Sequence, residues 1–231
     1  MRVIAVANQK GGTGKTTTAW AILTGATAKG KKALGIDFDP SGSLTFIMGA
    51  DGNRGSALKG AEIQHTPGGD IIAAGMDLVT ISNIESLREL ITRKEYEKKY
   101  NIIVIDCPPV LGRGLTCALR AATEIVIPLQ ADTMSIQGLY LLHTTINQVN
   151  PEAKILGAFL AKHNGRSILA RDMTEQIKQV CKSLAIPYLD TPIRSGIAIQ
   201  EAQALQQGIF DYAPNSKPAQ DYAALLKKLK I

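Results

Sequence analysis

A glycine-rich segment after the first apolar run constrains this chain more than any other feature of its sequence. Residues 3–7 are aliphatic, and residues 8–18 read N-Q-K-G-G-T-G-K-T-T-T. An apolar strand, a glycine-rich turn and a helix start together form the context that a phosphate-binding loop requires. The glycines allow the backbone to curl, so that successive N–H groups point at phosphate oxygens. The sequence therefore predicts a phosphate-binding loop between a strand and a helix.

The polar side chains of this loop have separate expected roles. Lys15 would reach the β- and γ-phosphates of a nucleotide, and the hydroxyl of Thr16 would take one position on Mg²⁺. Thr17 would add a contact to the α-phosphate. The predicted nucleotide-binding residues of the loop are Gly11, Gly12, Thr13, Gly14, Lys15, Thr16 and Thr17, and the resemblance described next adds Lys10.

A second lysine at the start of the loop is the basis of a family resemblance. The standard pattern has glycine at the position of Gln9, and Lys10 follows it here. The run K-G-G-T-G-K-T-T over residues 10–17 resembles the deviant Walker A loop of the ParA/MinD family of dimeric ATPases. The resemblance implies that Lys10 reaches the partner subunit's nucleotide and neutralises charge as the β–γ bond breaks. The alternative for Lys10 is a solvated surface lysine. ATP and Mg²⁺ are the cofactors that the resemblance implies.

Two further apolar runs end in carboxylates. One leads to Asp37 and Asp39, and the other leads to Asp106. Carboxylates at the carboxyl ends of parallel strands lie where ligands bind in open α/β sheets. The resemblance implies that Asp39 positions the attacking water, that Asp37 supports the Mg²⁺ site and that Asp106 is the Walker B carboxylate. The alternative for Asp39, which precedes Pro40, is a turn or helix cap. The predicted catalytic residues are Lys10, Lys15 and Asp39, and the predicted metal site comprises Thr16, Asp37, Asp39 and Asp106.

Alternating apolar runs and helical patterns predict a doubly wound α/β fold with a mostly parallel sheet. The chain has 231 residues, enough for one sizeable core, so one domain over residues 1–231 is expected. The resemblance suggests no N-terminal helix-turn-helix module, because the first strand begins at Arg2. The predicted strands are 2–8, 33–38, 70–74, 101–106, 124–128 and 154–161. The predicted helices are 15–29, 82–99, 115–121, 135–149, 167–185, 198–206 and 217–230, and residues 50–69 are expected to be surface loop.

The cysteine count and the net charge indicate the cellular setting and the kind of partner to expect. Three cysteines without metal-ligand spacing favour a reduced, cytoplasmic setting. The formal net charge of +6 favours a polyanionic partner. By the resemblance, this partner is DNA bound without sequence preference, and such binding weakens steeply with salt. The alternative for any one of these basic residues is a solvated helix face. The candidate DNA-binding residues are Arg166, Arg171, Arg194, Lys227 and Lys228, and by resemblance Pro192 contacts the adenine base.

The resulting prediction is an ATPase that moves or positions DNA. Mg²⁺-ATP would close a homodimer, and this dimer would bind DNA without sequence preference and so associate with the nucleoid. Slow hydrolysis, stimulated by a centromere-binding adaptor protein, would release it. The alternative is a MinD-like ATPase that binds a membrane through its C-terminal helix. In residues 221–231, one helix face carries Tyr222, Leu225, Leu226 and Leu229, and lysines lie opposite. Packing of this apolar face on the sheet is the stronger expectation.

Overall fold

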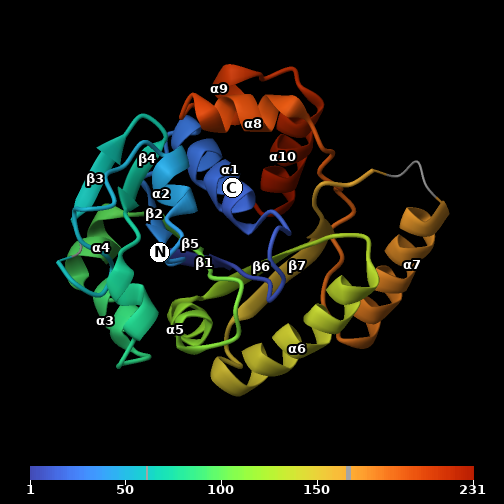
Figure 1. The fold of residues 1–231 in the computed structure, drawn as a ribbon, viewed down its shortest axis with the longest axis horizontal. Helices are drawn as coiled ribbons and strands as arrows, with labels where there is room; N and C mark the ends of the chain where they lie inside the picture. Colours follow the sequence, from blue (N-terminus) through green and yellow to red (C-terminus); the bar gives the residue numbers. More distant parts are fainter. Residues whose placement is uncertain (61, 165–167) are drawn as a thin grey trace.

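The computed structural model describes residues 1–60, 62–164 and 168–231. A sheet of seven strands crosses the described part of the molecule in the order β3-β4-β2-β5-β1-β6-β7 (Figure 1). Neighbouring strands are parallel except for the antiparallel pair β3 and β4. The predicted doubly wound α/β class is therefore confirmed. The strands are β1 (Arg2–Val6), β2 (Ala33–Asp37), β3 (Ile63–Thr66), β4 (Gly69–Ile72), β5 (Ile102–Asp106), β6 (Glu124–Leu129) and β7 (Lys154–Leu160).

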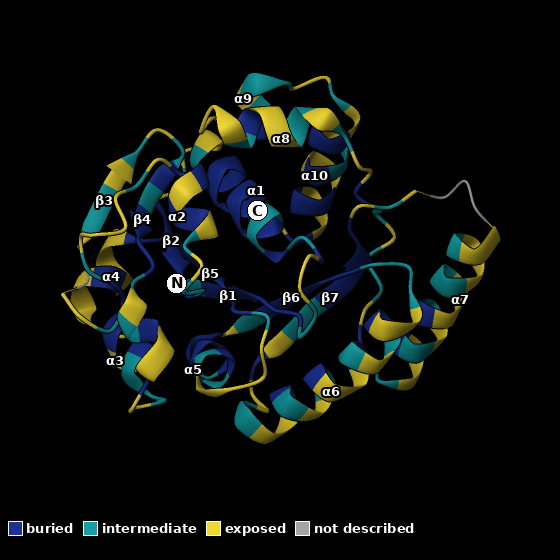
Figure 2. Cartoon of the chain, in the orientation of Figure 1, coloured by how far each residue is buried: buried dark blue, intermediate teal, exposed yellow. Residues whose placement is uncertain are grey.

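Helices cover both faces of this sheet. In Figure 1, α1, α2, α8, α9 and α10 lie on one side, and α3, α5, α6 and α7 lie on the other. Figure 2 shows that α1 is almost wholly buried, whereas α7 exposes much of its surface. The helices are α1 (Lys15–Ala28), α2 (Ser43–Ile47), the 3₁₀ turn η1 (Met76–Thr80), α3 (Ser86–Ile91), α4 (Lys94–Lys99), α5 (Arg113–Ala121), α6 (Thr133–Val149), α7 (Ile168–Ser183), α8 (Ile197–Ala204), α9 (Ile209–Tyr212) and α10 (Lys217–Lys228).

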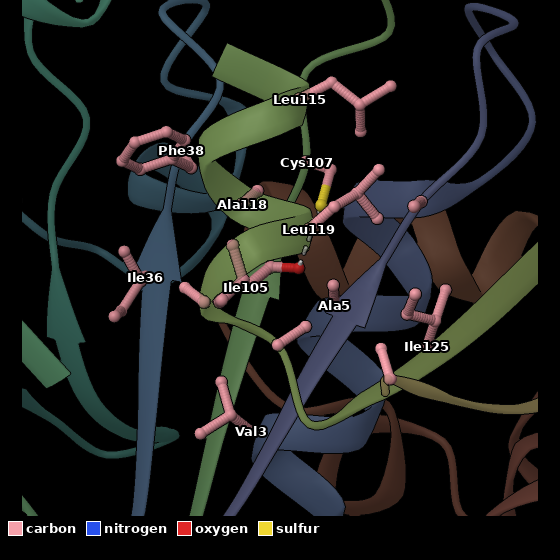
Figure 3. Close-up of a cluster of buried hydrophobic side chains, with 14 of the residues drawn as sticks. Val3, Ala5, Ile36, Phe38, Ile105, Cys107, Leu115, Ala118, Leu119 and Ile125 are labelled. Atoms are coloured by element: carbon pink, nitrogen blue, oxygen red, sulfur yellow. Dashed lines mark hydrogen bonds between the residues drawn. The ribbon is translucent and has the colours of Figure 1, made fainter. Parts of the chain in front are cut away.

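The central strands are apolar throughout because each of their faces packs against helices. In β1, Val3 and Ala5 belong to the core beneath α5, part of which is drawn in Figure 3. Ile4 and Val6 point to the opposite core, which contains α1 and α10. Side chains alternate between the faces of a strand, so a strand buried on both faces needs a continuous apolar run. This requirement explains the apolar sequence before the glycine-rich loop.

Two local predictions are wrong in part. Residues 50–69 contain strand β3, which pairs antiparallel with β4 at the edge of the sheet. Its sequence, I-Q-H-T, is short and polar, as edge strands are, so it gave no periodic signal. The helix predicted over 82–99 is two helices, α3 and α4. The hydroxyl of Thr92 donates to the carbonyl of Arg88 at 2.8 Å, and Arg93 is extended with ψ 136°, which ends the first helix.

The C-terminal helix packs its apolar stripe into the core, as expected. Tyr222, Leu225, Leu226 and Leu229 are at most 3% exposed. The Tyr222 hydroxyl lies 3.3 Å from the hydroxyl of Thr18 on α1. This burial removes the face that a membrane anchor would need. In the described ranges, no helix has the length and apolar character needed to cross a bilayer.

Candidate nucleotide-binding site

The register of the three central strands brings the predicted site together. Asp37 of β2 and Asp106 of β5 are direct partners across the two strands, and Val6 of β1 is the partner of Asp106 on the other side. Because all three strands are parallel, the loop after β1 begins beside Asp106 and at the same edge of the sheet as Asp37. Residues far apart in the sequence therefore meet at one edge of the sheet, where α/β proteins bind their ligands.

The loop after β1 has the backbone geometry that a bound phosphate requires. Gly12 and Gly14 have φ angles of +74° and +87°, in the left-handed region that favours glycine. Gly14 is the N-cap of α1, and no side chain caps the helix there. The first N–H groups of α1 are thus left for an anion, which the helix dipole also favours. A Cβ at Gly14 would lie 3.3 Å from the Cβ of Ala161, so the position is also tight.

Lys15 is a buried cation that faces the two carboxylate-bearing strands. It is 6% exposed, and its ammonium donates to the carbonyl of Lys10 at 3.0 Å. Burial lowers the pKa of Lys15, while the nearby negative charges of Asp106 and Asp39 work against this shift. A buried ammonium held by a single carbonyl retains donors for another oxygen ligand. The position therefore suits the phosphate contact predicted for Lys15.

Asp106 is fully buried at the carboxyl end of β5. In the described part of the chain, no group completes a hydrogen bond to either carboxylate oxygen. Burial and the charge of Asp37 raise the pKa of Asp106 well above its usual range, although the Thr16 hydroxyl beside it opposes the rise. Unpaired buried polar atoms are rare and need a reason. A carboxylate and a hydroxyl are oxygen donors of the kind that Mg²⁺ binds.

The residues present fit a magnesium ion shared with a nucleotide. Among the described residues, no group of three His, Cys, Asp or Glu side chains could hold an ion by itself. Mg²⁺ is usually bound by one or two carboxylates together with substrate phosphates and water. Thr16 and Asp106, beside the loop, match this mode of binding.

The carboxylate oxygens of Asp37 accept hydrogen bonds from the loop and helix that follow β2. One of its oxygens accepts from the backbone N–H and the hydroxyl of Thr45, at 2.7 and 2.8 Å, and the other accepts from the N–H of Asp39 at 3.3 Å. Burial raises the pKa of Asp37 to about 6, against the lowering effect of the Thr45 hydrogen bonds. Thr45 also accepts from the N–H of Ala74, so it connects β2, α2 and the end of β4. Sequence analysis missed Thr45.

Asp39 lies half-buried at the start of the loop between β2 and α2. Its carboxylate accepts from the N–H of Ser41 at 3.0 Å, and its carbonyl accepts from the N–H of Gly42. The turn predicted as an alternative role for Asp39 is therefore present. Only one carboxylate oxygen is used by this turn, and Asp39 lies close enough to influence the charge of Lys15. The turn fixes the position of the carboxylate and leaves an oxygen available.

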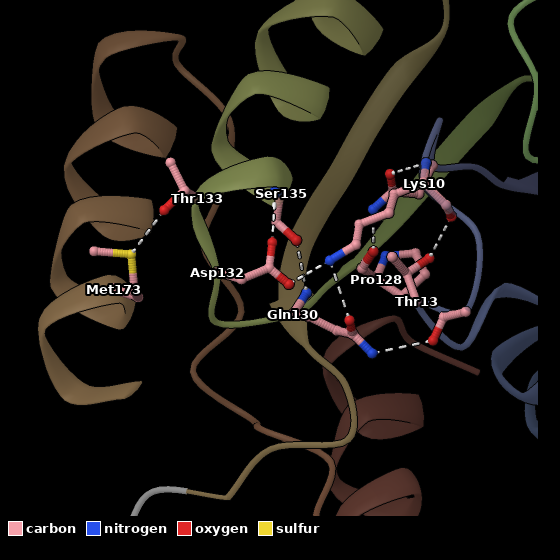
Figure 4. Close-up of polar contacts among 10 residues, drawn as sticks. Lys10, Thr13, Pro128, Gln130, Asp132, Thr133, Ser135 and Met173 are labelled. Carbon is pink, nitrogen blue, oxygen red and sulfur yellow. Dashed lines mark hydrogen bonds and ion pairs between the residues drawn. The ribbon is translucent and has the colours of Figure 1, made fainter. Parts of the chain in front are cut away.

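Lys10 contacts the segment between β6 and α6, as Figure 4 shows. Its ammonium forms an ion pair with Asp132 and donates to the side-chain oxygen of Gln130 at 3.3 Å. Its backbone N–H donates to Asn8 at 2.9 Å. Lys10 is therefore partly exposed and ion-paired within its own subunit. Asp132 was missed in the sequence, although an Asp before a helical pattern is an N-cap signal.

A cavity of about 760 Å³ adjoins Pro192, the predicted base contact. Its wall includes His163, Thr191 and Arg194. The Nδ1 atom of His163 and the hydroxyl of Thr191 are buried without a hydrogen-bond partner in the described structure. A second cavity of about 260 Å³ shares Arg194 with the first and reaches Gly14 of the loop. The two cavities give a route from the phosphate-binding loop to residues 191–194.

The basic residues predicted to contact DNA have different environments. Arg171 of α7 and Lys227 and Lys228 of α10 are exposed. The guanidinium of Arg194 instead pairs with both carboxylate oxygens of Asp221, at 2.8 and 2.6 Å. This ion pair offsets the charge that Arg194 would otherwise present to a phosphate. Arg166 lies outside the described residues.

The loop, the buried lysine and the unpaired carboxylate define a P-loop nucleoside triphosphatase site. A family model described as an AAA domain matches residues 1–158. The chromosome-partitioning ATPase Soj of Treponema pallidum is 32% identical, over 99% of this chain and 96% of that protein. The chain therefore belongs to the ParA/MinD family of P-loop ATPases.

Solved structures show the same fold. Cobyrinic acid a,c-diamide synthase from Mycobacterium smegmatis, solved with ADP and magnesium, has a TM-score of 0.80 and 29% identity, covering 100% of this chain and 96% of that one. The cell division ATPase MinD of Pyrococcus furiosus has a TM-score of 0.81 at 23% identity, covering 99% and 98% of the two chains. The second likeness concerns the fold alone.

Proposed function

We propose that this ATPase partitions or positions DNA, using Mg²⁺-ATP to close a homodimer. The observation that carries the proposal is the pair of lysines in the loop, Lys10 and Lys15, together with similarity to the chromosome-partitioning ATPase Soj. Lys15 is the buried lysine of the loop, whereas Lys10 is partly exposed on its rim. By the family resemblance, Lys10 serves the nucleotide of the partner subunit.

The nucleotide would occupy the route from the loop to residues 191–194. The N–H groups at the start of α1 and the ammonium of Lys15 would hold the phosphates, and Thr17 would contact the α-phosphate. Pro192 would pack on the base, and His163 and Thr191 would supply polar contacts to its edge. Thr16 and Asp106 would hold Mg²⁺, which neutralises charge on the phosphates when bound.

Asp39 would orient the water that attacks the γ-phosphate. Its turn keeps the carboxylate at the edge of the sheet, close to Lys15. Asp37 has a supporting part in this scheme, because its hydrogen bonds with Thr45 hold the loop that carries Asp39. We therefore propose Asp37 as a positioning residue for that loop, in place of the metal ligand expected from the sequence.

The Lys10→Ala variant is expected to bind ATP with nearly unchanged affinity as a monomer, but to lose ATP-dependent dimerisation. Lys10 is not part of the buried phosphate site of its own subunit, so its removal spares binding there. Titration with a fluorescent ATP analogue measures the first property, and sedimentation velocity at a series of protein concentrations measures the second. A Lys10→Ala variant that dimerises with ATP as the wild type does would show that the lysine has no role in trans.

DNA would bind across basic surfaces of the closed dimer. Arg171, Lys227 and Lys228 are exposed, although the ammonium of Lys228 also donates to the carbonyl of Asp190 at 3.0 Å. Three such residues in each subunit would neutralise about six phosphates per dimer. Salt dependence of this size corresponds to a loss of about 10³ in affinity between 50 and 200 mM salt. We expect the ATP-bound protein to lie on the nucleoid, and an adaptor protein to stimulate hydrolysis there.

The experiment that tests this function measures binding to a DNA duplex of arbitrary sequence with ATP, ADP and no nucleotide, across a salt series. Binding that requires ATP and falls steeply with salt is the expected result. In the Lys227→Ala/Lys228→Ala variant, the slope of log affinity against log salt is expected to fall by about four, because each dimer loses four phosphate contacts. If DNA binding is absent in every state while anionic vesicles bind with ATP, the membrane-associated alternative replaces the proposal.

A further inference from the structure

The ammonium of Lys10 is already occupied by its own subunit. It forms an ion pair with Asp132 and also donates to the side chain of Gln130 at 3.3 Å (Figure 4). The side chains of Lys10 and Asp132 are 29% and 36% exposed, so the pair lies at the surface but is partly shielded from water. Two of the three ammonium donors are used by these contacts, so a nucleotide in another subunit would have to compete with Asp132 and Gln130 for the lysine.

Asp132 is built into the fold in a way that keeps its carboxylate in place. It is the N-cap of α6, where one oxygen accepts from the N–H of Ser135 at 2.8 Å, and its other oxygen pairs with Lys10. Burial works to raise the pKa of Asp132, but the hydrogen bonds from Lys10 and Ser135 outweigh it and hold the pKa below its usual value. Asp132 is therefore ionised at neutral pH and competes for the lysine as an anion.

The rest of the segment between β6 and α6 strengthens this contact. The amide of Gln130 accepts from Lys10 through its oxygen and donates through its nitrogen to the carbonyl of Gly12 at 3.1 Å. Asn8 accepts from the backbone N–H of Lys10 and donates to the carbonyl of Pro128 at 2.6 Å. The lysine is thus held by both its side chain and its backbone to residues 128–132, which fixes the ammonium on its own subunit.

We propose that Asp132, with Gln130, restrains Lys10 within its own subunit, so that the dimer closes only when the partner's nucleotide displaces this carboxylate. The proposal rests on the proposed function, in which Lys10 acts in trans. The phosphates of ATP must therefore bind the Lys10 ammonium more strongly than Asp132 does before the dimer closes. The contact sets how much protein and ATP are needed before dimers form.

The size of the effect follows from the exposure of the pair. Ion pairs at this exposure contribute a factor of about two to five to an equilibrium. A symmetric dimer releases two such contacts when it closes, so removing both should strengthen dimerisation by roughly tenfold. The difference should shrink at high salt, because salt screens partly exposed charges.

The test compares the dimer dissociation constants of wild type and Asp132→Asn with a non-hydrolysable ATP analogue and Mg²⁺, by sedimentation velocity. Asparagine caps a helix as well as aspartate does, so the substitution removes the charge and keeps the N-cap. Asp172→Asn is the matched control, because it removes one exposed acidic charge from the neighbouring helix α7. Asp132→Ser is a second variant that retains a capping oxygen, should Asp132→Asn fold poorly by circular dichroism.

Three outcomes separate the proposal from the function on which it rests. A dissociation constant about tenfold lower for Asp132→Asn, unchanged for Asp172→Asn and converging on wild type at high salt, supports the restraint. An equal or weaker dimer for Asp132→Asn, while Lys10→Ala fails to dimerise, overturns the restraint and leaves the trans lysine in place. A Lys10→Ala variant that dimerises normally overturns both.

Discussion

The Lys15→Ala variant is expected to bind ATP at least about 100-fold more weakly than the wild type, and to hydrolyse it at an undetectable rate. Lys15 is the buried cation of the phosphate-binding loop, and its ammonium faces the carboxyl ends of β2 and β5. A charged hydrogen-bonding group removed from a buried site costs about 3 kcal/mol, which is a factor of about 100 in binding. The backbone N–H groups of the loop remain, but they do not replace a full positive charge.

Titration with a fluorescent ATP analogue in the presence of Mg²⁺ measures this loss. Lys10→Ala is the matched control, since it removes a lysine from the same loop without removing the buried cation. Comparable ATP affinity for Lys15→Ala and the wild type would show that the nucleotide does not bind at this loop. Equal losses in both variants would instead indicate a general disturbance of the loop.

The Asp106→Asn variant is expected to lose ATP hydrolysis by at least about 1,000-fold and, without nucleotide, to be more stable than the wild type. Hydrolysis is lost because the variant lacks the carboxylate that fits Mg²⁺, whose charge stabilisation phosphoryl transfer needs. Stability rises because Asp106 is a fully buried charge without a hydrogen-bond partner among the described residues. The expected gain is about 1–3 kcal/mol at pH 8.

The pH dependence of this gain has a definite sign. Burial raises the pKa of Asp106 well above its usual range, so the folded protein binds a proton that the unfolded chain has already released. The contribution of Asp106 to the free energy of unfolding is therefore most favourable below about pH 4 and falls as the pH rises through the pKa of the folded state. Burial also raises the pKa of Asp37, to about 6, so Asp37 adds to the same trend in the wild type. The advantage of Asp106→Asn should grow with pH.

Urea unfolding of both proteins without nucleotide or Mg²⁺, from pH 4 to pH 8, measures this difference, and a coupled phosphate-release assay measures hydrolysis. A stability difference that stays constant with pH would mean that Asp106 is not a buried, titrating charge.

The Asp39→Ala variant is expected to lose less hydrolytic activity than Asp106→Asn. It should bind Mg²⁺-ATP and dimerise, but hydrolyse about 100-fold more slowly, because it removes the group that orients water. Hydrolysis by Asp39→Ala at the wild-type rate would exclude Asp39 from that role.

The phosphate-binding loop could be predicted from sequence because its determinants are local. Gly12 and Gly14 allow φ angles that other residues avoid, and the apolar run before them requires a strand buried on both faces. The restraint on Lys10 could not be predicted in this way. Asp132 lies 122 residues further along the chain, and it reaches the loop only because β6 is placed beside β1 in the sheet.

The sequence by itself determined the α/β class, the phosphate-binding loop and the carboxylates at the ends of β2 and β5. Each of these depends on spacing within a short segment. The tertiary structure alone decided that Asp37 binds Thr45, that the stripe of α10 is buried and that Asp132 holds Lys10. These contacts join residues distant in sequence, and their partners depend on strand order and helix packing. A pattern along the chain shows which groups are present, whereas only the fold shows which of them meet.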